Sequence, residues 1–283
     1  MTEIHFAEMR KIVRKISERK RIVVKVGTST LTHHRTGRLN IRRVESLTKT
    51  LADIYNAGHE VILVSSGAIG VGLGKLGLTE RPGDTPGKQA CAAVGQCELM
   101  NLYDRLFADY SITVAQMLLT RYILLEDRRK NVENALERLL SMGAVPVVNE
   151  NDTVAIDELE LEVGENDSLA AVVATIGKAD LLIIMSDIDG LYDCDPHKSS
   201  EAHLIPVVHE IDENIRELAG GAGSKFGTGG MKTKIHAVEL AYEAGIDVVL
   251  MNGRKPERLY DLFEDKKVGT LFTLDRMAES PGA

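Results

Sequence analysis

The chain has 283 residues, of which 44% are hydrophobic and 4% aromatic, and its formal net charge is −8 at pH 7. This length allows one large α/β domain or two small ones, and the composition supports a core of Val, Ile, Leu and Ala. The negative charge argues against general nucleic-acid binding, which depends on clustered Lys and Arg.

Membrane and secretory signals are lacking in the sequence. No apolar run approaches the ~18 residues needed to span a bilayer, and the N-terminus has no apolar signal core. Cys91, Cys97 and Cys194 are an odd set without metal-like spacing. Cys91 and Cys97 fall in a helical pattern, and we expect both to be buried thiols. We therefore expect a reducing, cytoplasmic location and no membrane partner.

A basic segment, residues 1–20, precedes the rest. Its apolar residues follow the helical period at Met9, Ile12, Val13 and Ile16. The segment suits a membrane-surface or partner-binding helix, or an extra helix packed on the domain or an oligomer partner. A single stripe of four apolar residues favours the extra helix. We expect a helical extension at 1–20, one domain at 21–275 and a tail at 276–283.

The predicted elements alternate along the chain. Up to residue 148 they are a strand at Arg21–Val26, a helix at about 40–57, a strand at Glu60–Val64, a helix from Ala68, a loop at Arg81–Gly87, a helix at about 88–110, a strand at Ile112–Leu118, a helix at about 128–142 and a strand at Val145–Val148. Asn40 can cap the first helix. After residue 148 the predicted elements are a hairpin at Thr153–Val163, a helix at about 166–178, a strand at Leu181–Met185, a loop at Asp193–Pro206, a short helix near 212–218, a helix to Ala244, a strand at Asp247–Met251, a short helix from Pro256 and a strand at Val268–Leu274.

This alternation of strands and long helices predicts an α/β fold with an open, mainly parallel sheet sandwiched by helices in three layers. Ligands of such sheets bind at the carboxyl ends of the strands. Polar clusters follow the strands at those ends, at Gly27-Thr28-Ser29, Ser65-Ser66-Gly67, Asn149–Asp152 and Ser186-Asp187. Because loops at one rim can meet in space, we predict the binding site there.

A glycine-rich loop runs into a helix at Lys225–Lys234. Glycine adopts positive φ without steric cost, a helix start offers unpaired N–H groups, and Lys232 and Lys234 add positive charge. The segment suits a polyphosphate, and a plain flexible loop is the alternative.

Lys25 stands inside an apolar strand, two residues before Gly27. A buried, unpaired lysine is costly, and the glycine and hydroxyls that follow favour a phosphate-binding lysine over an exposed lysine of an edge strand. Neither a Walker A loop nor G-x-G-x-x-G after the first strand is present. Gly70–Gly74 falls in a helical pattern, which predicts close helix packing.

Long segments of the chain closely resemble the glutamate 5-kinases of the amino-acid kinase superfamily. They occur in family order as VVKVGTS (23–29), VSSGAI (64–69), GKQACAAVGQ (87–96), QMLLTR (116–121), VPVVNENDTVA (145–155), VGENDSLAA (163–171), DIDGLYDCDP (187–196), GTGGMKTKIHAVELAYEAGID (227–247) and VGTLF (268–272). The resemblance implies the amino-acid kinase (carbamate kinase-like) fold and ATP-dependent phosphorylation of the γ-carboxylate of L-glutamate, the first step of proline biosynthesis. A carboxylate with a pKa near ~4.3 needs no general base, so catalysis would rest on alignment and positive charge.

The resemblance also implies site residues. Lys25 and Lys234 would contact the transferring phosphate, and Asp167, whose alternative role is a helix N-cap, would orient them. Nucleotide binding would use Lys25, Gly27, Thr28, Ser29, Ser186, Asp187, Thr228, Gly229, Gly230, Met231, Lys232, Thr233 and Lys234. Glutamate binding would use Ser66, Asp152 and Asn166, with Asp152 near the α-ammonium. Mg²⁺ is implied, held chiefly by nucleotide phosphates, and the protein ligands stay open.

Two departures from the family accompany these expectations. Many members carry a C-terminal PUA domain, and we expect this chain to lack one; Glu165 stands where the family often has aspartate. The family further suggests feedback inhibition by proline and assembly into dimers or tetramers. A kinase for acetylglutamate, aspartate, carbamate or a nucleoside monophosphate is one alternative. A non-catalytic amino-acid sensor is another, which the retention of Lys25, Asp167 and Lys234 disfavours.

Overall fold

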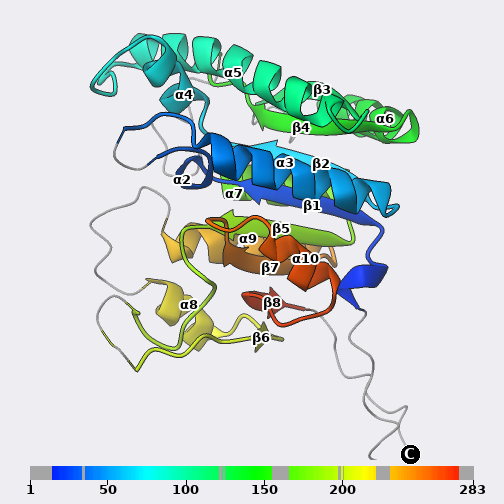
Figure 1. The fold of residues 1–283 in the computed structure, drawn as a ribbon. Helices are drawn as coiled ribbons and strands as arrows, with labels where there is room; N and C mark the ends of the chain where they lie inside the picture. Colours follow the sequence, from blue (N-terminus) through cyan, green and yellow to red (C-terminus); the bar gives the residue numbers. More distant parts are fainter. Residues whose placement is uncertain are drawn as a thin grey trace, which may run out of the picture.

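The computed structural model describes residues 15–33, 36–120, 123, 125–154, 166–196, 199, 201–220 and 230–273. Across these residues, a sheet of eight strands in the order β3-β4-β2-β1-β5-β7-β8-β6 runs between two layers of helices (Figure 1). Neighbouring strands are parallel except β7 and β8, which are antiparallel. This architecture confirms the predicted three-layer α/β fold.

The strands are β1 (Arg21–Val26), β2 (Glu60–Ser65), β3 (Thr113–Leu119), β4 (Ala144–Glu150), β5 (Leu181–Ser186), β6 (Val207–Val208), β7 (Asp247–Asn252) and β8 (Thr270–Phe272). The helices are η1 (Ile16–Glu18), α2 (Thr28–Leu31), α3 (Ile41–Asn56), α4 (Ala68–Lys75), α5 (Thr85–Ala108), α6 (Glu126–Ser141), α7 (Asn166–Ile176), α8 (Glu213–Gly220), α9 (Met231–Glu243) and α10 (Arg258–Phe263).

The two faces of the sheet form separate apolar cores. On β1, Ile22, Val24 and Val26 belong to the core that includes side chains of α3, α5 and α10. Val23 belongs to the core that includes side chains of α6, α7 and α9. Since side chains alternate along a strand, Lys25 projects to the face covered by α7 and α9.

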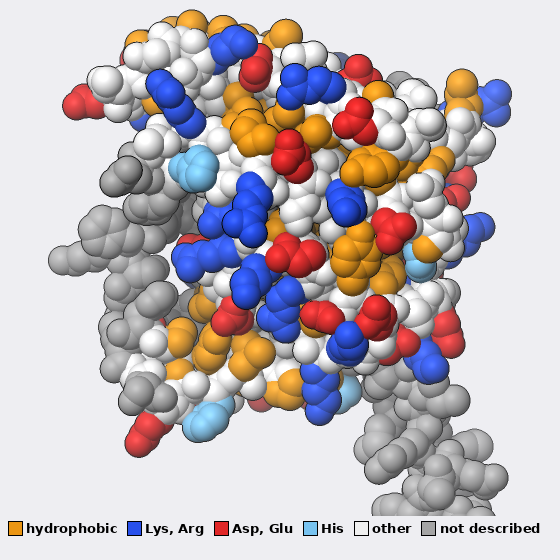
Figure 2. All heavy atoms as spheres, viewed as in Figure 1, with side chains coloured by type: hydrophobic (Ala, Val, Ile, Leu, Met, Phe, Trp, Pro, Cys, Tyr) orange, Lys and Arg blue, Asp and Glu red, His pale blue; other side chains and the backbone are white. Residues whose placement is uncertain are grey.

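Helix α3 shows how the outer layers form. Its N-cap Asn40 accepts a hydrogen bond from Arg43 N–H at 3.2 Å, as the sequence predicts. The helix buries a stripe of residues that recur with the helical period, Val44, Leu47, Leu51 and Ile54. Charged side chains occupy its outer face, and Figure 2 shows Lys and Arg gathered on this side of the molecule with acidic residues among them.

Several predicted boundaries are wrong. Helix α5 begins at Thr85, inside the predicted loop, because Asp84 caps it by accepting from Gly87 N–H at 3.1 Å, and the first turn tolerates proline. The last strand, β8, is shorter than predicted, whereas β6 and α2 were not predicted. The predicted hairpin lies outside the described residues except for its first two positions.

The cysteine prediction is half right. Cys91 is buried, but Cys97 is exposed. Six residues along an α-helix correspond to roughly 600° of rotation, so the two thiols face different directions on α5. Among the residues that the structure describes, no helix is long and apolar enough to cross a bilayer.

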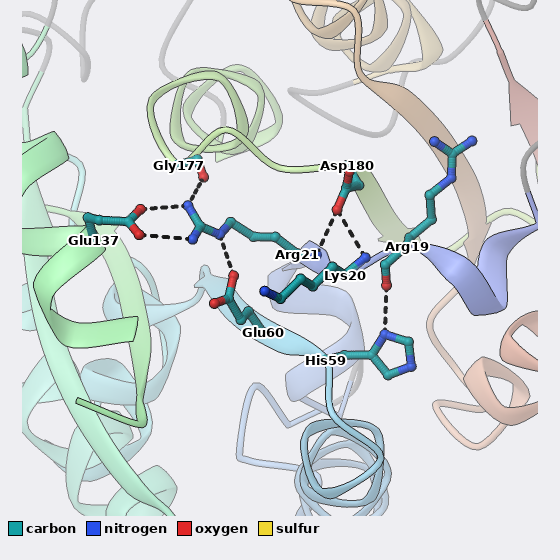
Figure 3. Close-up of polar contacts among 8 residues, drawn as sticks. All are labelled: Arg19, Lys20, Arg21, His59, Glu60, Glu137, Gly177 and Asp180. Atoms are coloured by element: carbon teal, nitrogen blue, oxygen red, sulfur yellow. Dashed lines mark hydrogen bonds and ion pairs between the residues drawn. The ribbon is translucent and has the colours of Figure 1, made fainter. Parts of the chain in front are cut away.

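Residues just before β1 are fastened across the amino ends of the strands (Figure 3). The carboxylate of Asp180 accepts from the backbone N–H groups of Lys20 and Arg21 at 3.0 and 2.9 Å. Arg19 forms a largely buried ion pair with Asp247, and its carbonyl oxygen lies 2.7 Å from His59 Nδ1. These contacts tie the start of β1 to β2, β5 and β7.

Arg21 extends this fastening toward α6 and α7. Its guanidinium donates to Glu60 at 2.7 Å, to Glu137 at 2.8 Å and to the carbonyl of Gly177 at 2.6 Å, and its side chain is only 13% exposed (Figure 3). One planar group thereby joins β1, β2, α6 and the end of α7.

We expect Arg21→Met to lower the free energy of unfolding by about 1–3 kcal/mol, because three acceptors lose a charged partner. Lys178→Met is the matched control, since its ion pair with Glu133 joins side chains that are 72% and 36% exposed. Exposed pairs contribute roughly 0–1 kcal/mol. Urea unfolding of both variants makes the comparison, and equal losses would contradict it.

Candidate active site

Two lysines and one aspartate from three elements meet near the carboxyl end of β1. Asp167, in the first turn of α7, is 1% exposed. Its Oδ1 lies 2.6 Å from Lys25 Nζ, and its Oδ2 lies 3.1 Å from Lys234 Nζ. Both lysines are buried as well. One carboxylate therefore bridges two ammonium groups that are far apart in the sequence.

The fold explains why these three side chains converge. Lys25 lies on β1, between β2 and β5, so the alternative of an edge-strand lysine does not hold. Its side chain points to the sheet face that α7 and α9 cover. Asp167 and Lys234 lie in the first turns of those two helices, which pack against each other.

Charge balance favours an anion at this cluster. Burial by itself raises the pKa of Asp167, because a low-dielectric environment disfavours the ionised form. The attraction of Lys25 and Lys234, with a hydrogen bond from each, outweighs burial and holds the pKa below its usual value. The carboxylate is thus ionised at neutral pH, and the three groups keep one formal positive charge in excess.

The turn after β1 leaves room beside this cluster. Gly27 precedes α2, and a Cβ atom built on it would lie 3.6 Å from Lys25 Nζ and 3.8 Å from Ser29 Oγ. A side chain at position 27 would occupy the space between the lysine and the hydroxyl. Thr28 lies against the next turn, since a Cβ on Gly67 would be 3.5 Å from Thr28 Oγ1. The turns after β1 and β2 therefore adjoin.

Ser66 and Asn166 form a second polar group at the rim. Asn166 Nδ2 lies 2.6 Å from Ser66 Oγ and 3.1 Å from Asn149 Oδ1. Ser66 N–H donates to Val26 O at 3.1 Å, which ties the turn after β2 to the end of β1. Asn166 precedes Asp167, so this group adjoins the lysine cluster through α7.

Two polar side chains of α5 also reach this group, and neither is among the predicted site residues. Gln96 Oε1 accepts from Asn149 Nδ2 at 2.8 Å, and Tyr103 Oη lies 2.9 Å from Ser65 Oγ. Gln96 lies in the GKQACAAVGQ segment and Asn149 opens the polar cluster after the fourth predicted strand, so the sequence contains a signal for both. Tyr103 looks like an ordinary core residue in the sequence.

Asp152 lies in the turn after β4, at the same rim. Burial raises the pKa of its carboxyl to about 6, against an opposing attraction from Arg81. A carboxylate that is only partly solvated gains most from a cationic partner, so this position fits an ammonium group.

Ser186 is the last residue of β5, the strand beside β1, and Asp187 follows it. Ser186 Oγ donates to Asp187 Oδ1 at 3.1 Å, and Gly253 N–H donates to Ser186 O at 2.7 Å. In the sheet, Met185 pairs with Val26, which places Ser186 beside the turn at Gly27.

Part of the predicted glycine-rich loop is described. Gly230 is the N-cap of α9, and Thr233 Oγ1 donates to its carbonyl at 2.9 Å. Met231 and Thr233 are partly buried, Lys232 is exposed, and only Lys234 of these residues joins Asp167. Thr228, Gly229 and Glu165 lie outside the described residues.

The sequence identifies no protein ligands for Mg²⁺. Among the residues that the structure describes, no group of three or more His, Cys, Asp or Glu side chains could hold a metal ion. The hydrogen-bond donors at the rim are ammonium, amide and hydroxyl groups, which match phosphate and carboxylate oxygens as acceptors.

Known proteins share both sequence and fold with this chain. The model of the amino acid kinase family matches residues 20–252. Glutamate 5-kinase of Clostridium perfringens is 52% identical, over 91% of this chain and 96% of that protein. Glutamate 5-kinase of Enterococcus faecalis is 49% identical with the same coverage, and that of Carboxydothermus hydrogenoformans is 48% identical over 93% of this chain and 70% of that protein.

Solved structures with low sequence identity show the same fold. UMP kinase from Ureaplasma parvum has a TM-score of 0.60 at 17% identity and covers 90% of this chain and 98% of its own. Isopentenyl phosphate kinase from T. acidophilum has a TM-score of 0.59 at 19% identity and covers 89% of this chain and 100% of its own. The family model and the relatives of about 50% identity show that the chain belongs to the amino acid kinase family and, within it, to the glutamate 5-kinases.

Proposed function

We propose that the cluster around Asp167 is the phosphoryl-transfer centre of this protein. The protein is a phosphotransferase that phosphorylates the γ-carboxylate of L-glutamate with ATP, giving L-glutamyl 5-phosphate and ADP, the first step of proline biosynthesis. The observation that carries the site assignment is the convergence of Lys25 and Lys234 on one buried carboxylate.

The reaction forms one covalent bond and breaks one. A γ-carboxylate oxygen of glutamate bonds to the γ-phosphorus of ATP, the bond from that phosphorus to the β–γ bridging oxygen breaks, and ADP leaves with the electron pair. No proton moves, because the acceptor is already ionised at neutral pH. The barrier arises chiefly from bringing two anions together, so fixed positive charge is the expected catalytic device.

Lys25 and Lys234 supply that charge in our proposal, one from the sheet and one from α9. Asp167 holds both ammonium groups, which lowers the cost of ordering two long side chains beside each other. Because the lysines are held before substrates bind, little reorganisation is needed in the transition state.

The remaining predicted residues divide between the two substrates. We assign to ATP the turn after β1, the end of β5 and the start of α9, with residues Gly27, Thr28, Ser29, Ser186, Asp187 and Thr228–Lys234. We assign to glutamate Ser66, Asp152 and Asn166. The polar group of Ser66 and Asn166 adjoins Asp167 along α7, which is consistent with an acceptor beside the transferring phosphate.

Mg²⁺, proline and assembly belong to the same proposal. Mg²⁺ would be carried by the ATP phosphates and would neutralise part of their charge. Proline would inhibit at or overlapping the glutamate site, and the protein would form dimers or tetramers in the cytoplasm. Thermal shifts with each ligand, and light scattering, test these points directly.

The pH dependence of glutamate binding tests the assignment of Asp152. Its pKa of about 6 means that the carboxylate loses its charge as the pH falls through that value. We expect kcat/KM for glutamate to fall below pH 6, approaching tenfold per pH unit, with little change in the KM for ATP. Asp152→Asn should show weak glutamate use and no such dependence. Identical pH profiles for the two proteins would contradict the assignment.

The acceptor itself is tested by ADP release from Mg-ATP in the presence of different acids. We expect release with L-glutamate and little with L-aspartate or N-acetylglutamate. Release with another acid only would retain the ATP site and overturn the acceptor. A lack of ADP release with every acid tested would favour a non-catalytic sensor.

A further inference from the structure

We infer that Gln96 on α5 is a positioning residue for the acceptor side of the active site, acting through Asn149. The inference rests on the proposed function. Within the described part of the chain, Gln96 makes no hydrogen bond to the lysine cluster or to the predicted glutamate-binding residues. It orients the side-chain amide of Asn149, whose oxygen faces Asn166 of the proposed glutamate site.

The hydrogen bonds of Asn149 fix the orientation of its side-chain amide. Asn149 Nδ2 donates to Gln96 Oε1 at 2.8 Å, so the amide oxygen of Asn149 is the atom that faces α7. There it accepts from Asn166 Nδ2 at 3.1 Å. A flipped Asn149 would place its NH₂ group against the NH₂ group of Asn166, and two donors cannot bond to each other.

The same ordering reaches Ser66. Asn166 Nδ2 also donates to Ser66 Oγ at 2.6 Å and lies 3.4 Å from Ser65 O. Because Ser66 Oγ accepts this bond, its own hydroxyl hydrogen is available to an anion. Gln96 thus sets, through two asparagines, the polarity that turns Ser66 into a donor for a substrate carboxylate.

Helix α5 is placed rigidly enough for this task. A Cβ atom on Gly95, the residue before Gln96, would lie 1.8 Å from Ala68 O, so the backbones of α5 and α4 are in direct contact. Helix α4 begins at Ala68, two residues after Ser66. Helix α5 also contacts Ser65, the residue before Ser66, because Tyr103 Oη lies 2.9 Å from Ser65 Oγ. Gln96 and Ser66 therefore belong to one fixed unit.

Gln96→Met removes the acceptor and keeps the length of the side chain. We expect the KM for glutamate to rise roughly tenfold, the factor that corresponds to one lost hydrogen bond. The kcat and the KM for ATP should stay within about twofold, and the melting temperature within a few degrees. Gln96→Ala removes the same acceptor without a bulky replacement. If Gln96→Met does not fold, Gln96→Ala shows whether loss of the acceptor raises the KM for glutamate.

The matched control is Glu98→Gln on the same helix. It removes the 2.8 Å ion pair between Glu98 and Lys75, which also joins α5 to α4 but contacts no amide of the group. Its KM values should equal those of the wild type.

The outcomes separate the inference from the proposed function. If the wild type phosphorylates glutamate and both Gln96 variants keep its KM, the inference is wrong and the function stands. If kcat and both KM values change together with the melting temperature, Gln96 is merely structural and the inference is also wrong. If the wild type does not phosphorylate glutamate, the proposed function fails and the inference fails with it.

Discussion

Lys234→Ala should lower kcat by roughly 10²–10³-fold while changing stability far less. The side chain supplies one of two positive charges next to the proposed transferring phosphate, and loss of a preorganised charge of this kind costs about 3–4 kcal/mol of transition-state stabilisation. Lys25 Nζ lies 2.6 Å from Asp167 Oδ1, so the buried carboxylate would still have a cationic partner in the variant. Steady-state kinetics and thermal unfolding together measure the two effects.

His236→Ala is the control for that experiment. His236 follows two residues later on α9, is exposed, and lies 3.8 Å from Glu239 on the outer side of the helix. It should leave kcat unchanged. If Lys234→Ala lost folding and activity to the same degree, Lys234 would be a structural residue and the assignment of the cluster would be wrong.

Gly72→Ala should destabilise the protein by about 3 kcal/mol or more. A Cβ atom at this position would lie 1.8 Å from Cys91 O, 2.7 Å from Cys91 C and 2.9 Å from Gly95 N. All three atoms are backbone atoms of α5, so no side-chain rotation relieves the clash and the two helices must separate. Because α5 carries Gln96 and Tyr103, glutamate use should fall along with stability.

Gly74→Ala, two residues further along α4, separates this clash from the general effect of alanine in a helix. A Cβ atom there would meet only the Arg38 residue at 3.8 Å or more, an ordinary contact. Alanine favours helix over glycine by up to about 1 kcal/mol, so this variant should be neutral or slightly stabilised. Urea unfolding compares the two, and equal stability would show that α4 and α5 are not in backbone contact.

The central strands were predictable because each is a short, apolar, β-branched run. β1 agrees with its prediction, and β2, β5 and β7 each extend one residue beyond theirs. The edge of the sheet was not predictable in the same way. β6 has two residues, one of them, Val207, 38% exposed, and it exists only because β8 lies beside it. Such a pairing is a tertiary property that local sequence does not encode.

The lysine cluster shows what sequence can and cannot give for a site. Family resemblance singled out Lys25, Asp167 and Lys234, and strand alternation placed Lys25 on a definite face. That Asp167 bridges both lysines follows only from the packing of α7 and α9 on that face.

The sequence marks the segment that contains Gln96 but not the contact that Gln96 makes. Glutamine is common in helices, and its partner Asn149 lies on a strand 53 residues later. A hydrogen bond between such distant residues depends on how α5 packs over the sheet. The polar residues that matter here are therefore recognised by their contacts rather than by their local pattern.

The most direct test of the account is to trap the product with hydroxylamine. The purified protein is incubated with Mg-ATP, L-glutamate and hydroxylamine, and the products are identified by mass spectrometry. We expect γ-glutamyl hydroxamate in amounts that match ADP, and we expect its loss in Lys234→Ala. ADP without hydroxamate, or hydroxamate formed equally by Lys234→Ala, would contradict acyl phosphate formation at this cluster.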